Sequence, residues 1–230
     1  MKSKKFNTER YNILLNDKNV SWEQKFRVYQ SIKTIGKNKK VLDVGCYDGY
    51  FAEKIKDMGN DVLGLDISEQ AVKLCNQRGI KCIEADLEER LPLKDKTFDV
   101  IYAGGIIEHV FDTDNFLKEL NRILKYNGVL LLDTPNIAAL NKRIKLLMGK
   151  NPDTDIGIFS LNGKKSSGHI RYFTIKTLEK LLNRNGFSIT EFKTDFILFN
   201  RFRLIKLGKL FPRLGWTIII RARKNETTKD

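Results

Sequence analysis

The 230-residue sequence contains few of the side chains that bind metal ions or form disulfides, with three cysteines and two histidines. Cys46, Cys75 and Cys82 are too far apart for a metal knuckle, and their odd number argues against a closed disulfide framework. We interpret them as reduced packing residues. His109 and His169 have no metal-ligand spacing either, so we expect no metal site, and any catalysis should work without zinc.

Long apolar runs are absent as well. No stretch approaches the roughly 18 consecutive apolar residues of a membrane span, and the N-terminal residues lead into no apolar signal core. The apolar content of 41% is enough to fill a sizeable core. We expect a cytoplasmic protein with an N-terminal helical segment over 1–37 and one main domain over 38–230, with cap insertions at about 136–173 and 196–214.

Acidic residues are in the minority. The chain has 28 Asp and Glu against 42 Lys and Arg, a net charge of +14, and residues 196–225 contain eight Lys or Arg and no acidic residue. Such an excess attracts nucleic acid, an anionic membrane surface or an acidic substrate, although a solvated lysine-rich surface has the same composition. Charge alone does not choose among these partners, so peripheral contact with a membrane stays open.

Apolar runs alternate regularly with helical patterns. Five runs predict strands, at 41–44, 62–65, 81–83, 98–102 and 129–132. The segments between them predict helices, at 49–58, 68–78 and 113–125. This alternation is typical of a doubly wound α/β fold, in which helices cover both faces of a mostly parallel sheet.

The second half of the chain adds a cap and two further strands. Residues 137–148 predict an amphipathic helix with Lys142 and Lys145 outside an apolar face that includes Leu147 and Met148. Residues 151–168 indicate a loop or lid. A capped helix is predicted at 174–185, and strands at 187–193 and 216–223, which gives a sheet of seven strands.

The strand at 41–44 runs into a glycine turn, Gly45-x-x-x-Gly49, and then a helix. Ligands of open α/β sheets bind at this carboxyl edge, where glycines allow close backbone approach and a helix start offers free N–H groups. The turn by itself could be only a tight connection. Asp66 ends the next strand and could accept both hydroxyl protons of a ribose, and Asp86 ends the third strand and could meet an adenine amino group. Three successive strand ends therefore point at one nucleoside, although both aspartates could simply cap helices.

A dinucleotide-binding protein is the obvious competitor, but its fingerprint requires G-x-G-x-x-G, and positions 45–50 read GCYDGY. The segments VLDVGCYDG, LGLDIS, ADLEE, FDVIYAGGIIEHV and LKYNGVLLLDTPN resemble, in order and spacing, the motifs of class I S-adenosylmethionine-dependent methyltransferases. The later TPN and GHIRYFT segments look like the type 11 and MetW-like members. The resemblance covers about residues 38–137 well and implies the class I methyltransferase fold with S-adenosyl-L-methionine as cofactor.

The resemblance also implies which residues hold the cofactor. Its methionine end would lie against Asp43, Gly45 and Gly49, its ribose against Asp66, and its adenine against Asp86 and Leu87. The remaining positions of this set are Cys46, Tyr47 and Ile67. The family loop usually has a glycine where this chain has Tyr47, so a positive φ there would strain the tyrosine by roughly 1 kcal/mol.

Methyl transfer is an in-line displacement, so the protein must align donor and acceptor and accept a proton where the acceptor carries one. His109, after the fourth strand, is the first candidate base, and Glu108 could tune it. His169 and Arg171 are candidates for binding the acceptor from the cap. Each has an ordinary alternative: His109 could only order a loop, and the other two could lie on an exposed basic segment.

The similar methyltransferases often serve small molecules, lipids or glycans, so we expect such an acceptor, and the basic charge favours an anionic one. Two alternatives stay open. An RNA methyltransferase would use the basic charge, but YAGGIIEHV lacks the Asp/Asn-Pro-Pro-aromatic sequence of amino-group DNA methylases. A MetW-like partner protein would keep the fold and act by forming a complex rather than by catalysis.

Overall fold

The computed structural model describes residues 21–152 and 168–225. Seven strands form one sheet in the order β3-β2-β1-β4-β5-β9-β6. Neighbouring strands among β1 to β5 are parallel, while β9 runs antiparallel between β5 and β6. This arrangement confirms the predicted, mostly parallel seven-stranded sheet. The strand bounds are Lys40–Val44 (β1), Asp61–Asp66 (β2), Lys81–Glu84 (β3), Phe98–Gly104 (β4), Leu124–Pro135 (β5), Phe187–Lys193 (β6) and Thr217–Lys224 (β9).

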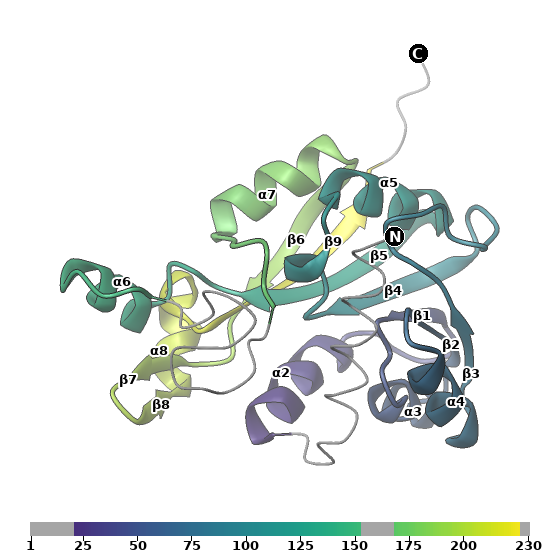
Figure 1. Ribbon diagram of the computed structural model, residues 1–230, viewed down its shortest axis with the longest axis horizontal. Helices are drawn as coiled ribbons and strands as arrows, with labels where there is room; N and C mark the ends of the chain where they lie inside the picture. Colours follow the sequence, from purple (N-terminus) through teal and green to yellow (C-terminus); the bar gives the residue numbers. More distant parts are fainter. Residues whose placement is uncertain (1–20, 153–167, 226–230) are drawn as a thin grey trace.

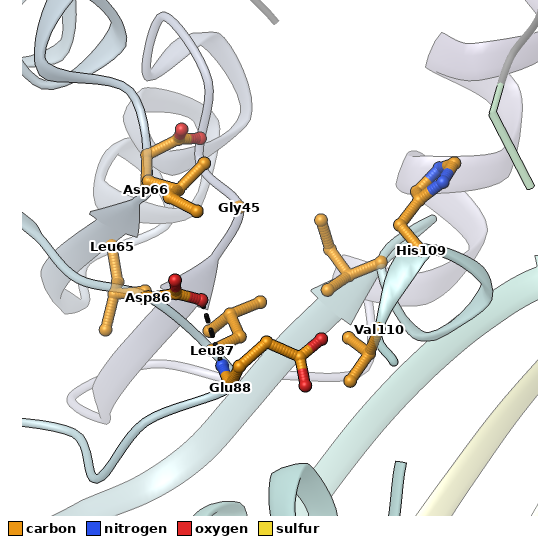
Figure 2. Close-up of a pocket in the computed structure, with 10 residues that line it drawn as sticks. Gly45, Leu65, Asp66, Asp86, Leu87, Glu88, His109 and Val110 are labelled. Carbon is orange, nitrogen blue, oxygen red and sulfur yellow. Dashed lines mark hydrogen bonds between the residues drawn. The ribbon is translucent and has the colours of Figure 1, made fainter. Parts of the chain in front are cut away.

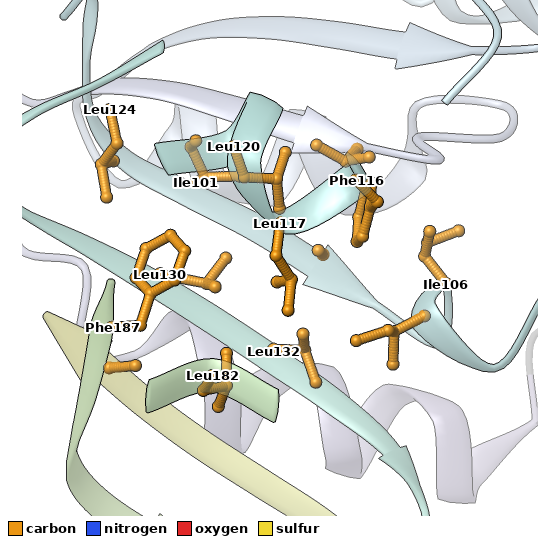
Figure 3. Packing of buried hydrophobic residues seen from close by; sticks show 14 of the residues in the cluster. Ile101, Ile106, Phe116, Leu117, Leu120, Leu124, Leu130, Leu132, Leu182 and Phe187 are labelled. Atoms are coloured by element: carbon orange, nitrogen blue, oxygen red, sulfur yellow. The ribbon is translucent and has the colours of Figure 1, made fainter. Parts of the chain in front are cut away.

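Helices cover both faces of the sheet because successive strand residues point to opposite sides. Leu42 packs with α5 (Thr113–Ile123) and α7 (Ile175–Arg184) in one hydrophobic cluster. Val41 packs in a second cluster with α2 (Trp22–Ile32), α3 (Tyr50–Asp57) and α4 (Glu69–Gln77). Figure 1 shows α5 and α7 on one side of the sheet and the other three helices on the opposite side. Figure 3 shows Phe116, Leu117 and Leu120 of α5 packed over β4 and β5.

Local capping determines where three of the predicted helices begin. The Ser68 hydroxyl accepts a hydrogen bond from Ala71 N (3.3 Å), Asp112 Oδ1 accepts one from Asn115 N (2.9 Å), and Thr174 forms a capping box with Thr177. These side chains satisfy amide groups that lack partners in a first helical turn. Helix α5 ends at Ile123, two residues earlier than predicted, because Leu124 already pairs with Phe98 as the start of β5.

The prediction of an amphipathic helix over residues 137–148 is wrong in part. The structure forms α6 over Leu140–Leu147, but Leu147 is 88% exposed and Met148 56% exposed. Lys142, predicted to face outward, is buried, and its ammonium group lies 5.6 Å from the centroid of the Trp216 ring. A cation over an indole face is attracted to the ring, and this contact turns the lysine inward.

A small lobe lies outside the main sheet and the helices that cover it. It contains α6 together with β7 (Ile197–Phe199), β8 (Phe202–Leu204), α8 (Ile205–Leu210) and the short helix η2 (Pro212–Leu214). These elements project at one end of the molecule (Figure 1). The loop or lid predicted at 151–168 falls mostly outside the described residues, as does the first part of the N-terminal segment. Among the described helices, none is long and apolar enough to cross a membrane.

Candidate cofactor and acceptor site

The glycine turn after β1 has the backbone geometry that requires glycine. Gly45 has φ +72° and Gly49 has φ +79°, both in the left-handed region. A Cβ atom on Gly45 would lie 2.1 Å from Cδ1 of Ile106, in the turn after β4. The turns after β1 and β4 therefore pack so closely that only a residue without a side chain fits at position 45.

Asp66 at the end of β2 holds the glycine turn in place. Its Oδ2 accepts a hydrogen bond from Tyr47 N (2.9 Å), and its Oδ1 accepts one from Ser68 N (3.0 Å). Burial raises the pKa of Asp66, and these backbone hydrogen bonds oppose the shift. Tyr47 has φ +54°, so the positive φ considered from the sequence does occur at this tyrosine.

Asp86 and Glu88 order the segment after β3. Asp86 Oδ1 accepts a hydrogen bond from Glu88 N (3.0 Å), which Figure 2 shows as a dashed line. The Glu88 carboxylate accepts hydrogen bonds from Phe111 N (2.5 Å) and Asp112 N (3.0 Å). Glu88 thus ties the segment after β3 to the segment after β4. Sequence reasoning missed this residue, although it belongs to the ADLEE segment.

A hollow that is open to solvent lies at the carboxyl ends of these strands. Of the predicted residues, Gly45, Asp66, Ile67, Asp86, Leu87 and His109 line it (Figure 2). Leu65, Glu88, Ile106 and Val110 complete the lining. Asp43, Cys46, Tyr47 and Gly49 belong to β1 and its turn and do not line the hollow.

Asp43 fits the role of a buried acceptor for a cationic group. Its carboxylate is buried, and its Oδ2 has no hydrogen-bond partner among the described residues. Burial raises the pKa of Asp43 to about 8, with further contributions from Cys75 and Asp66. An unpartnered carboxylate under the glycine turn, beside two further strand-end aspartates, suits the amino group and nucleoside of S-adenosylmethionine.

The three cysteines come together behind the same turn, although they are distant in the sequence. Cys46 Sγ lies 3.1 Å from Cys82 Sγ and 3.7 Å from Cys75 Sγ. All three are free and buried, as predicted for packing residues. Their sulfur atoms are close enough together to hold a metal ion, which the sequence spacing did not indicate. Gly64 leaves room for them, because a Cβ there would lie 2.7 Å from Cys46 Sγ.

The turn after β4 collects the candidate catalytic groups. His109 lies in η1 (Ile107–His109), and its ring centroid is 4.9 Å from that of His169. Ligand atoms of Glu108, His109 and His169 all lie within 4.8 Å of one another, so these side chains could also hold a metal ion. Burial raises the pKa of Glu108 to about 7, while a hydrogen bond from the Thr134 hydroxyl (2.9 Å) opposes the shift. Sequence spacing could not reveal this group, because residues 108 and 169 meet only in the folded chain.

The segment that carries His169 is fastened to the turn after β4 by its backbone. Ile170 N and Arg171 N both donate hydrogen bonds to Glu108 O, at 2.9 and 3.1 Å. Arg171 itself is exposed, and its Nη2 donates to Phe111 O (2.5 Å). The structure therefore brings His169 next to His109 and leaves Arg171 outside the lining of the hollow.

An ion pair between the partly exposed Arg27 and the buried Asp133 connects α2 to the same region. Arg27 Nε lies 3.0 Å from Asp133 Oδ1, and the Tyr102 hydroxyl donates to Asp133 Oδ2 (3.0 Å). The Arg27 guanidinium also reaches Gly105, where a Cβ would lie 3.3 Å from Nη2. Sequence reasoning missed Arg27 and Asp133, since nothing local to either residue signals the other.

The strand order, the glycine turn and the carboxylates at successive strand ends define a class I methyltransferase fold. A structure of an S-adenosylmethionine-dependent methyltransferase from Archaeoglobus fulgidus has this fold, with a TM-score of 0.65 and 22% identity over 93% of this chain and 99% of that one.

Sequence comparisons show which proteins this chain is similar to. A methyltransferase-domain model matches residues 42–132. A probable S-adenosylmethionine-dependent methyltransferase of Mycobacterium tuberculosis is 33% identical over 84% of this chain and 62% of the relative. The ubiquinone biosynthesis O-methyltransferase of Pelagibacter ubique is 38% identical over 52% of this chain and 49% of the relative. The chain thus spans less than two thirds of these curated relatives. The chain is therefore similar to S-adenosylmethionine-dependent methyltransferases, in agreement with the predicted family and cofactor.

Proposed function

We propose that this chain transfers the methyl group of S-adenosylmethionine to a small-molecule, lipid-linked or glycan acceptor. The supporting observation is that Asp66 and Asp86, which suit a nucleoside, and His109, a candidate base, line one hollow. When bound, the cofactor supplies an electrophilic methyl group on a cationic sulfur. The protein's own residues would orient it through Asp43, Asp66 and Asp86 and align the acceptor for in-line displacement.

The residues after β4 would handle the acceptor proton. Glu108 has a pKa of about 7, and His109 and His169 lie beside it, so this group can accept a proton near neutral pH. His109 would be the base that contacts the acceptor, because it lines the hollow, whereas Glu108 is buried and does not line it. The name of the Pelagibacter relative, an O-methyltransferase, supports an oxygen nucleophile.

The acceptor we propose carries negative charge. Arg171 lies exposed on the segment next to His169 and could form a two-point contact with a carboxylate or phosphate once released from Phe111. The net charge of +14 would draw such a molecule to the protein. Peripheral membrane contact would supply the acceptor if it is lipid-linked.

A labelling experiment tests this function. Methyl-labelled S-adenosylmethionine is offered with the protein to fractionated cell extract, and the labelled fraction is identified. We expect label in a small-molecule, lipid or glycan fraction, and less label with Asp66→Ala. Label in RNA would replace the proposed acceptor by a nucleic acid. Failure to label any fraction, together with a stoichiometric protein partner in a pull-down, would favour the non-catalytic, MetW-like alternative.

A further inference from the structure

The lobe formed by residues 140–151 and 196–215 exposes an unusual amount of apolar surface. Leu147 is 88%, Leu210 69% and Phe202 68% exposed. Further large apolar side chains exposed on the same lobe are Leu146, Met148, Phe199, Leu207 and Phe211. Single exposed apolar residues are common on protein surfaces, but a set of this size on adjoining elements marks an interaction surface.

The lobe is a built structure and not a loose tail. Asp195 at its base is buried and accepts hydrogen bonds from Phe196 N (2.7 Å) and Thr217 N (3.1 Å). Gly208 of α8 packs so closely that a Cβ would lie 3.1 Å from Phe196 Cα. Helix α6 contacts β7, which also contacts α8. The exposed apolar side chains are therefore held outward by an ordered scaffold.

The lobe is also strongly basic. Its two segments contain nine Lys or Arg and no Asp or Glu. Five of these cations are exposed on the second segment, namely Arg201, Arg203, Lys206, Lys209 and Arg213. Cations interleaved with large apolar side chains match a surface that is negatively charged outside and apolar inside.

We propose that this lobe docks on an anionic lipid bilayer, with its apolar side chains entering the interface and its cations contacting lipid phosphates. Two other occupants fit less well. A second copy of the lobe would bring nine positive charges against nine, and nucleic acid offers phosphates but no apolar layer for exposed leucine and methionine side chains.

The lobe joins the acceptor side of the methyltransferase site. Ile137 N, just before α6, donates to Phe173 O (3.0 Å), and the preceding residues Ile170 and Arg171 are bonded to Glu108 O. Docking would therefore hold the His109 and His169 region close to the bilayer. This inference rests on the proposed function and deepens it, because it names an anionic membrane as the source of the acceptor.

Vesicle co-sedimentation tests the docking. The whole protein is mixed with phosphatidylglycerol and phosphatidylcholine vesicles, and with vesicles of phosphatidylcholine alone. We expect binding to the anionic vesicles at low salt and weaker binding at high salt. One variant removes apolar groups (Leu147→Ser, Phe202→Ser, Leu210→Ser), and a second reverses charges (Arg201→Glu, Lys206→Glu, Lys209→Glu). Each should weaken vesicle binding by about tenfold or more.

A charge-matched control separates this surface from general attraction. Lys118, Lys176 and Lys180 are exposed on α5 and α7, away from the lobe, and their replacement by Glu makes the same change in net charge. The control should keep vesicle affinity within about twofold. An equal loss in the control, or no vesicle binding by the unaltered protein, would overturn the proposal, as would displacement of the protein from vesicles by equimolar duplex RNA. Calorimetric binding of S-adenosylmethionine to every variant verifies folding, and methyl labelling without vesicles tests the enzymatic function separately.

Discussion

At the residue scale, one hydrogen bond stabilises the conformation of the glycine turn after β1. Tyr47 has φ +54°, a conformation that costs a non-glycine residue roughly 1 kcal/mol. Its N–H donates to Asp66 Oδ2 at 2.9 Å, and a hydrogen bond to a charged group contributes about 1.5–3 kcal/mol. The bond outweighs the strain. The turn therefore keeps a left-handed residue at this position without a glycine.

Asp66→Ala should weaken S-adenosylmethionine binding by about 1.5–3 kcal/mol, because the variant loses the proposed ribose acceptor, which also accepts the hydrogen bond from Tyr47 N. Isothermal titration calorimetry measures the change. Asp61→Ala, at the exposed opposite end of β2, is the matched control and should bind the cofactor normally. Unchanged affinity in Asp66→Ala would remove Asp66 from the ribose site.

Glu108 should make the protein less stable as the pH rises through the slightly acidic range. Its pKa is about 7 when folded, against an ordinary 4.5, so the folded state binds more protons between these values. The contribution of Glu108 to the free energy of unfolding is then fully present below about pH 4.5 and decreases up to about pH 7. Above that pH, this contribution changes no further. In urea unfolding, Glu108→Gln should flatten this fall, whereas Glu89→Gln, at an exposed position, should leave it unchanged. An unaltered slope in Glu108→Gln would contradict the assignment.

At the element scale, the segment 168–173 connects the cap to the turn after β4. It is fastened there through Glu108 O, and His109 Nδ1 lies 3.2 Å from Gly168 O. None of its residues lines the hollow that contains Asp66 and Asp86. Under the proposed function, the segment would contact the acceptor without supporting the cofactor.

The double replacement His169→Ala and Arg171→Ala should separate acceptor from cofactor binding. We expect cofactor affinity within about threefold of the unaltered protein, while kcat/KM for the acceptor falls by roughly a hundredfold, a loss of about 2.7 kcal/mol. Lys176→Ala and Lys180→Ala, exposed on α7, form the matched control. A collapse of cofactor affinity with normal turnover at saturating cofactor would instead assign the two residues to the cofactor site.

At the scale of the whole molecule, folding assembles groups that no local pattern connects. Glu108, His109 and His169 could hold a metal ion. However, the Glu108 carboxylate already accepts a hydrogen bond from the Thr134 hydroxyl. In-line methyl transfer from a sulfonium also needs no Lewis acid. We therefore still expect activity to survive EDTA. Activity lost in EDTA and restored by one divalent ion would show a metal site, and alanine at His169 should then abolish that restoration.

Much of the fold follows from local features of the sequence. The strand runs and the helical patterns predicted the elements, and the side chains of Ser68, Asp112 and Thr174 cap three of the helices. Each of these features depends on residues within a few positions of one another. The expectation that Asp66 and Asp86 come together rests on a related reason: parallel strands bring their carboxyl ends to one edge, and both aspartates line one hollow there.

The sequence by itself thus determined the positions of the strands along the chain, the glycine turn, the carboxylates at strand ends and the excess of positive charge. Only the tertiary structure decided the pairing of Arg27 with Asp133, the meeting of His109 with His169, the approach of three thiols and the inward turn of Lys142. The physical reason is how far apart in the sequence the interacting residues lie. Periodicity and capping act over one or two helical turns, whereas these contacts join distant segments and depend on how the helices pack over the sheet.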